Sequence, residues 1–110
     1  MAKFVKGDVV VVPFPFSDLT QSQKRPALVI ATLEGDDVIL SQITSKTIKD
    51  NYSISLDDKD FETGSLKQPS NLRPNRLFTA DSHIILYRIG ILHKVKVNEI
   101  IDKIIEIIRK

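Results

Sequence analysis

The sequence contains no cysteine in its 110 residues. A disulfide framework and a thiolate metal site are therefore excluded. Long apolar runs are missing as well, and no stretch approaches the roughly 20 consecutive apolar residues of a membrane-spanning helix. Lys6 and Asp8 introduce charge before any long apolar region begins. We therefore expect a cytoplasmic protein with no membrane partner.

The chain also lacks a large excess of charge of either sign. It has 16 Lys and Arg against 14 Asp and Glu, and this balance neither requires nor excludes a nucleic-acid partner. The sequence has no glycine-rich phosphate loop followed by Lys-Ser or Lys-Thr, and no dinucleotide-binding fingerprint. His83 and His93 lie ten residues apart with no third ligand at metal spacing. We expect neither a metal site nor a cofactor.

The composition, 42% hydrophobic and 27% charged residues, is typical of a globular protein, and the length fits a single domain over residues 1–110. Apolar and β-branched runs bounded by Gly, Pro and Asp indicate strands. The predicted strands span residues 8–16, 26–32, 38–44, 52–56 and 77–81. The continuous apolar run of the second strand indicates burial on both faces, and Gly35 suits a hairpin turn before the third. We expect residues 17–24 to form a polar loop, a candidate binding loop.

The second half of the chain is less regular. Pro69 and Pro74 predict irregular structure over residues 61–74, with at most a short strand at 72–73. Residues 84–92 fit either a short strand or a helical turn. Apolar residues then recur at three-and-four spacing, which predicts a C-terminal helix capped by Asn98, with its apolar stripe packed on the core. The stripe comprises Val97, Ile100, Ile101, Ile104, Ile105 and Ile108.

The order of these elements predicts a mainly β fold. Several short strands separated by turn signals and followed by one helix indicate a small twisted antiparallel sheet that closes toward a barrel. Small barrels of this kind often bind nucleic acid, but the fold alone does not decide the function.

Arg25 stands between the polar loop and a buried strand. Held there by rigid backbone, its planar guanidinium can donate two parallel hydrogen bonds to phosphate oxygens at any physiological pH. The alternative is an arginine that ends a loop and pairs with a nearby carboxylate such as Asp18. Taken alone, the second interpretation is the more ordinary one.

Thr44 and Ser45 end the third predicted strand. The turn at Gly35 makes that strand antiparallel to the second, so Thr44 returns toward the end where Arg25 begins its strand. One pocket can then hold both side chains, with a hydroxyl for a phosphate or ribose oxygen and Lys46 as a further charge. The alternative is a Thr-Ser pair that satisfies its own turn.

Several segments together resemble a known family. They are GDVVVVPFPFSDL at residues 7–19, KRPALVI at 24–30, QITSK at 42–46, GSL at 64–66 and SNLRPNRLFT at 70–79. The individual motifs are loose, but their order and spacing over nearly the whole chain resemble the MazF/PemK family of type II toxins.

The resemblance implies a small SH3-like barrel that forms homodimers and cleaves single-stranded RNA without a metal. It also implies a cognate antitoxin whose tail occupies the same groove. Arg25 matches the family's catalytic arginine and Thr44 its catalytic hydroxyl residue. Arg73 matches a further arginine that some plasmid-borne relatives use with an aspartate two positions on. Here Asn75 stands at that second position, and an amide cannot take a proton as a carboxylate can.

From this resemblance we expect attack by the RNA 2′-hydroxyl on the adjacent phosphorus. Arg25 would stabilise the charge that develops on the phosphate and Thr44 would orient it. The predicted RNA contacts are Ser17, Asp18, Lys24, Ser45, Lys46, Arg73 and Asn75. Phe14, Phe16 and Tyr52 are available to stack on bases. Asp18 and His83 are both candidates for the general base, and the sequence does not choose between them.

A second hypothesis of a different class is a toxin of the same fold that inhibits DNA gyrase by binding, without RNA cleavage. The pairing of Arg25 with Thr44 favours cleavage. A third is a catalytically idle member that only binds its antitoxin.

Overall fold

The computed structural model describes residues 4–14 and 23–110, without the side chain of Phe14. The described chain forms seven strands, two short 3₁₀ helices and one α-helix. The strands are β1 (Asp8–Phe14), β2 (Gln23–Thr32), β3 (Asp37–Thr44), β4 (Ile54–Leu56), β5 (Phe61–Gly64), β6 (Ser70–Asp81) and β7 (Tyr87–Leu92). The helices are η1 (Asp58–Asp60), η2 (Ser82–Ile84) and α1 (Lys94–Arg109).

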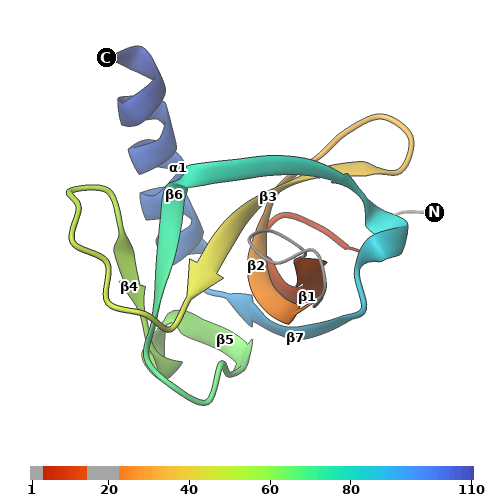
Figure 1. Cartoon of the computed structure of the whole chain (residues 1–110), viewed down its shortest axis with the longest axis horizontal. Coiled ribbons are helices and arrows are strands. Elements are labelled where there is room, and N and C mark those ends of the chain that lie inside the picture. Colours follow the sequence, from red (N-terminus) through yellow and green to blue (C-terminus); the bar gives the residue numbers. More distant parts are fainter. Residues whose placement is uncertain (1–3, 15–22) are drawn as a thin grey trace.

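All seven strands belong to one antiparallel sheet with the order β4-β6-β3-β2-β1-β7-β5. The sheet curls into an open half-barrel, and α1 lies at one side of it (Figure 1). The predicted mainly β fold with a C-terminal helix is therefore confirmed. Residues far apart in the chain become neighbours, because β1 in the first quarter pairs with β7 in the last.

Two apolar clusters lie on the two faces of the central strands. One includes Val9, Leu28 and Ile43 together with the inward side of α1, and the other includes Val10, Ala27 and Leu40. Neighbouring residues of a strand point to opposite faces of the sheet, so both faces of β1, β2 and β3 are covered. The prediction that the run after Pro26 is buried on both faces is confirmed at residues 27–29.

The prediction of irregular structure over residues 61–74 was wrong, because this region contains β5 and the first part of the long β6. Proline lacks an N–H and is tolerated in a sheet only where no ladder hydrogen bond is needed. The structure meets that condition by a bulge: Ser41 of β3 pairs with Leu77, whereas Gln42 pairs with Arg73, so Pro74 and the two residues after it have no partner on β3. A bulge also bends its strand, and β6 turns sharply in Figure 1.

The predicted helix is confirmed, but its start is not at Asn98. The helix begins at Lys94 after His93, whose side chain makes no capping hydrogen bond. Instead, the N–H of His93 donates to the carbonyl oxygen of Asp60 at 2.9 Å, so a tertiary contact fixes where β7 ends and the helix starts.

The apolar stripe of the helix is core packing over only part of its length. Val97, Ile100 and Ile104 are buried, whereas Ile108 is 69% exposed. Ile105 is exposed as well, although its neighbour Ile104 is buried. The C-terminal end of α1 extends past β6 (Figure 1).

The structure corrects one further prediction and resolves another. The strand predicted over residues 52–56 is shorter, since the N–H groups of Tyr52 and Ser53 both donate to the Asp50 carboxylate rather than to a neighbouring strand. The alternatives for residues 84–92 are resolved, because η2 ends at Ile84 and β7 follows as a strand.

Candidate functional site

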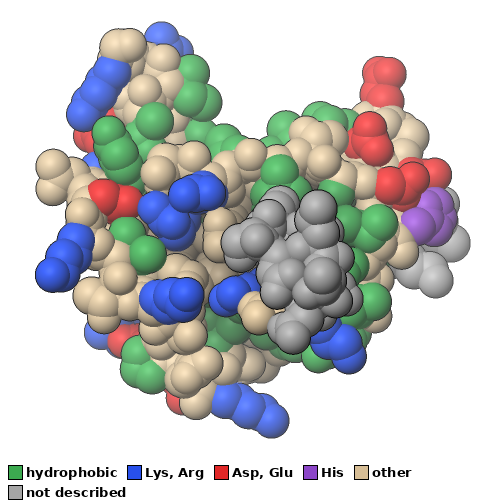
Figure 2. All heavy atoms as spheres, viewed as in Figure 1, with side chains coloured by type: hydrophobic (Ala, Val, Ile, Leu, Met, Phe, Trp, Pro, Cys, Tyr) green, Lys and Arg blue, Asp and Glu red, His purple; other side chains and the backbone are tan. Residues whose placement is uncertain are grey.

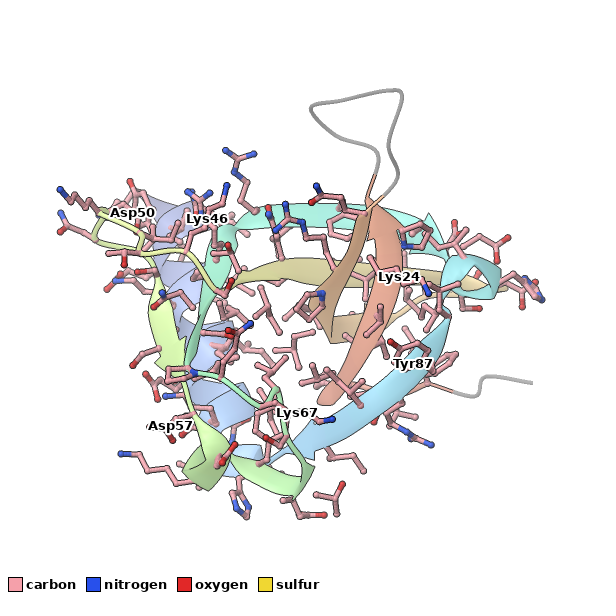
Figure 3. All side chains as sticks on the ribbon, turned by 60° about the horizontal axis from the view of Figure 1, so that its bottom comes forward. Lys24, Lys46, Asp50, Asp57, Lys67 and Tyr87 are labelled. Carbon is pink, nitrogen blue, oxygen red and sulfur yellow. The ribbon has the colours of Figure 1, made fainter. Side chains whose placement is uncertain are left out.

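A cleft of about 470 Å³ opens where β2 begins and β3 ends. Lys24 and Arg25 of β2, Thr44 and Ser45 at the end of β3, and Tyr87 of β7 line it. The connection between β5 and β6 completes the lining with residues 65–68. Lys24, Tyr87 and Lys67 thus reach the cleft from three separate segments of the fold (Figure 3).

The strand register explains why Arg25 and Thr44 share this cleft. β2 and β3 are antiparallel, and the pairs of this ladder end at Ala27 opposite Gln42. Two residues further on, β2 carries Arg25 and β3 carries Thr44, so the two side chains leave the same end of the ladder. Arg25 is also paired with Val12 of β1, which holds its backbone on the other side. The predicted juxtaposition of Arg25 and Thr44 is confirmed.

Hydrogen bonds orient both side chains. One guanidinium nitrogen of Arg25 donates to Oε1 of Gln23 at 2.7 Å. Oγ1 of Thr44 accepts from the N–H of Lys46 at 3.2 Å, and Thr44 is only 5% exposed. Because the Thr44 oxygen accepts this bond, its own O–H proton is left to donate to a ligand.

The charge of the cleft favours an anionic ligand. Its described lining contains the cations of Lys24, Arg25 and Lys67 and no carboxylate. A second hollow of about 510 Å³ beside the start of α1 is similar in size, but three lysines there are matched by Asp60, Glu62 and Glu99. Size therefore does not distinguish the two hollows, and the unbalanced positive charge does.

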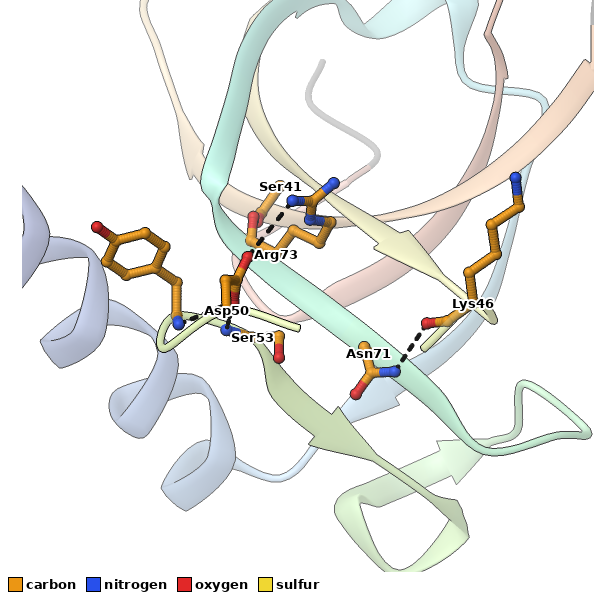
Figure 4. Close-up of polar contacts among 7 residues, drawn as sticks. Ser41, Lys46, Asp50, Ser53, Asn71 and Arg73 are labelled. Atoms are coloured by element: carbon orange, nitrogen blue, oxygen red, sulfur yellow. Dashed lines mark hydrogen bonds and ion pairs between the residues drawn. The ribbon is translucent and has the colours of Figure 1, made fainter. Parts of the chain in front are cut away.

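Polar contacts from β6 hold the connection between β3 and β4. Nδ2 of Asn71 donates to the carbonyl oxygen of Lys46 at 3.0 Å, and the guanidinium of Arg73 pairs with the Asp50 carboxylate at 3.4 Å (Figure 4). The Lys46 side chain extends away from Asn71 in this view. These contacts fix the segment that follows Thr44.

The pKa of Asp50 is lowered, first by the backbone N–H of Ser53, then by that of Tyr52 and by Arg73. A carboxylate with a depressed folded-state pKa stabilises the fold above its unfolded pKa, and this contribution is lost as the pH falls through the folded value. Asp50→Asn mimics the protonated acid. We expect the stability difference between wild type and this variant to be constant near neutrality and to shrink below about pH 4. Urea unfolding from pH 7 to pH 3 measures it, and a difference independent of pH would contradict the expectation.

The other predicted contacts are distributed differently. Lys24 and Ser45 lie in the cleft with Arg25 and Thr44, whereas Lys46, Arg73 and Asn75 are not among its lining residues. Asn75 is exposed in the bulge of β6. Ser17, Asp18 and Phe16 lie outside the described residues, and nothing is described of the Phe14 side chain.

The lining residues that sequence reasoning did not assign to the site include Lys67 and Tyr87. Tyr87 is 50% exposed and lies in the cleft, whereas the predicted stacking residue Tyr52 does not line it. The signal for Lys67 was its place directly after the GSL segment of residues 64–66. Tyr87 had no comparable signal.

His83, one of the two candidate bases, does not line the cleft. Its Nδ1 lies 2.6 Å from Oδ1 of Asp81 and 4.0 Å from Oδ2 of Asp36, and all three residues are exposed. In Figure 2 acidic side chains and a histidine occupy one edge of the face, whereas Lys and Arg side chains lie across its middle. Asp81 is a local neighbour of His83, whereas Asp36 is brought to it by the fold, and all three lie on the exposed surface.

The fold and the cleft define a class of protein: a small curled β-sheet with one terminal helix and a cationic, hydroxyl-bearing cleft suited to phosphate. The family model for PemK-like, MazF-like toxins of type II toxin-antitoxin systems matches residues 5–108. The chain belongs to this family. No curated protein sequence matches it.

Solved structures share the fold at low sequence identity. An endoribonuclease from a mycobacterial species, solved in complex with its cognate antitoxin, has a TM-score of 0.74 at 11% identity over 94% of this chain and 92% of its own. The Mycobacterium tuberculosis toxin MazF-mt6 has a TM-score of 0.67 at 15% identity over 88% and 91%. A second mycobacterial endoribonuclease has a TM-score of 0.69 at 15% identity over 96% and 91%. Among the described residues, no helix has the length and apolar character to cross a membrane.

Proposed function

We propose that the protein is the toxin of a type II toxin-antitoxin system and acts as an endoribonuclease that cleaves single-stranded RNA without a metal. The observation that carries this proposal is the meeting of Arg25 and Thr44 in one cleft whose described lining is cationic and free of carboxylates. Two of the solved structures that share the fold are named endoribonucleases, which supports the same activity.

The reaction requires little more than positioning and charge stabilisation. The 2′-oxygen attacks the adjacent phosphorus, the bond to the 5′-oxygen breaks, and a cyclic phosphate and a free 5′-hydroxyl remain. Arg25 donates to the non-bridging oxygens as their negative charge grows, an interaction commonly worth about 3 kcal/mol in the transition state. The bond from Arg25 to Gln23 holds the guanidinium in place before the substrate arrives.

Thr44 orients the scissile phosphate by donating its O–H to an oxygen of that group. The attack also needs a base for the 2′-hydroxyl proton. The described lining of the cleft carries neither a carboxylate nor an imidazole, so we assign the base to none of these residues. Asp18 remains a prediction.

Single-stranded substrate follows from the same chemistry. The 2′-oxygen must lie in line with the bond that breaks, and A-form pairing holds the sugar and phosphate away from that geometry, whereas unpaired bases can splay out and stack on aromatic rings. The half-exposed ring of Tyr87 is a platform within the cleft. Lys24 and Ser45 bind RNA there, and Lys46, Arg73 and Asn75 contact it outside the cleft. Ser17 and Asp18 remain predicted RNA contacts.

The proposal extends to two protein partners. The protein acts as a homodimer, and a cognate antitoxin inhibits it. One of the solved structures that share the fold holds an endoribonuclease with its cognate antitoxin, which supports the second partner.

The test is cleavage of a long unstructured RNA by the purified protein in EDTA. We expect fragments that carry a cyclic phosphate and a 5′-hydroxyl, and the mapped ends will identify the preferred sequence. Intact RNA together with inhibited supercoiling by DNA gyrase would overturn the proposal in favour of a toxin that acts by binding. Cleavage only after addition of a divalent metal would overturn its metal independence.

A further inference from the structure

The connection between β5 and β6 carries a strained lysine. Lys67 has φ +67°, and every other described residue with positive φ is a glycine, at positions 7, 35 and 64. Residues with a Cβ rarely adopt this left-handed conformation, because it costs free energy that glycine avoids. Strain of this kind tends to persist at functional sites, where the surrounding structure enforces it. The chain thus retains a side chain where glycine would be less strained.

Hydrogen bonds hold this lysine in place. The N–H of Lys67 donates to Oγ of Ser65 at 2.9 Å, and that hydroxyl donates to Oδ1 of Asp58 at 2.6 Å. Asp58 belongs to η1, which is closed at its start by reciprocal bonds between Asp57 and Asp60. The backbone of Lys67, from which its side chain extends, is therefore anchored to a capped helical turn.

The position and the charge of Lys67 point to a ligand. Lys67 lines the same cleft as Lys24 and Arg25. Its ammonium group makes no ion pair with a carboxylate of the described residues, whereas Lys59 and Lys96 nearby both do. A single strand of nucleic acid carries one phosphate per nucleotide, so a cleft that holds more than the scissile phosphate needs further cations.

We propose that Lys67 binds a backbone phosphate beside the scissile one, and that Asp58 acts through Ser65 as its positioning residue. The inference rests on the proposed function, because it takes RNA as the ligand of the cleft. It adds a second phosphate subsite on the wall opposite β2. The strained turn fixes the start of the lysine side chain before RNA binds, so less conformational freedom is lost on binding.

Lys67→Asn tests the subsite, because asparagine tolerates the left-handed conformation and removes the charge. The probe is a 2′-O-methyl RNA of mixed sequence, which lacks the attacking hydroxyl and stays intact. We expect affinity to fall roughly 5- to 10-fold at 50 mM salt and the slope of log K against log salt to lose about 0.7, the value of one phosphate contact on a single strand. Lys94→Asn, which removes an exposed lysine outside the cleft, leaves both quantities nearly unchanged.

Thermal unfolding of the Lys67 variants and the RNA affinity of Lys67→Arg distinguish a loss of RNA binding from a loss of folding. Lys67→Asn and Lys67→Gly should unfold at or above the wild-type midpoint temperature, since both relieve strain, and Lys67→Arg should restore most of the affinity. A wild-type salt slope in Lys67→Asn, with RNA still bound and cleaved, would overturn the subsite and leave the proposed function standing. A wild-type protein that neither binds nor cleaves RNA would overturn both.

Asp58→Ala tests the positioning role. Loss of a negative charge near a cationic cleft strengthens RNA binding by electrostatics alone, whereas loss of the anchor for Ser65 weakens it. We expect about threefold weaker binding in the wild-type background and no further weakening in Lys67→Asn, because residues that act as a unit are not additive. Equal weakening in both backgrounds, or tighter binding in the wild type, would overturn the role of Asp58.

Discussion

Replacing Arg25 with alanine should lower the rate of RNA cleavage at least about 100-fold while the protein stays folded. Arg25 lies near the start of β2 and lines the cleft, and its guanidinium donates a hydrogen bond to Gln23. Arg25 is not part of either apolar cluster. Its loss therefore removes charge stabilisation in the transition state and little packing. Initial rates with the same unstructured RNA in EDTA measure the effect, and circular dichroism with thermal unfolding reports the fold.

Two control variants test whether the loss of activity is specific to Arg25 and to its guanidinium. Arg109→Ala removes an exposed arginine at the end of α1 and should cleave at the wild-type rate. Arg25→Lys keeps the charge but loses the planar fork that binds two phosphate oxygens, so it should fall between wild type and alanine. An Arg25→Ala protein that is folded and cleaves within a few-fold of wild type would remove Arg25 from the catalytic role.

Gly64→Ala should lower the free energy of unfolding by about 3 kcal/mol, the combined cost of steric overlap and a left-handed alanine. Gly64 has φ +78°, and a methyl group there would overlap the carbonyl oxygen of Ile89 and lie 2.5 Å from Cα of Gly90. This contact joins β5 to β7 directly before the turn that holds Lys67. Urea unfolding at neutral pH measures the loss.

The chain offers a matched control in Gly35→Ala. Gly35 has a similar φ of +74°, but no atom of the described residues beyond Gly35 and its two chain neighbours lies within 4 Å of the position of an added methyl group. Its substitution should cost only about 1 kcal/mol, the conformational part alone. The difference between the two losses of unfolding free energy measures the steric cost of the close approach of β5 and β7. Equal losses would show that this packing does not exclude a side chain at residue 64.

The first half of the fold could be predicted from local sequence. The apolar run after Pro26, the turn at Gly35 and the next run define a hairpin, and an antiparallel hairpin determines which of its residues face each other. The juxtaposition of Arg25 and Thr44 follows from that register, and the roles that we propose for them come from the family resemblance. The structure supplied the orienting hydrogen bond that Arg25 donates to Gln23, and it showed that the described residues lining the cleft include no carboxylate.

The second half could not be predicted in the same way. Pro74 indicated irregular structure, but a bulge in β6 accommodates it, and the partner strand that makes the bulge favourable lies more than 30 residues earlier. The contact of His93 with Asp60 likewise overrode the capping signal of Asn98. In each case a distant part of the chain, rather than local preference, decided the structure: the pairing of β6 with β3 around Pro74, and the carbonyl group of Asp60 at His93.

The sequence by itself determined the class of fold, the family and the nearness of Arg25 to Thr44, because hairpin register is a local property of the chain and motif order can be read along it without the fold. Only the tertiary structure decided that Lys67 and Tyr87 complete the cleft, that Arg73 pairs with Asp50, and that His83 lies outside the cleft. Those relations depend on the order of strands in the curled sheet. That order is set by the burial of both faces of β1, β2 and β3, a property of the whole molecule.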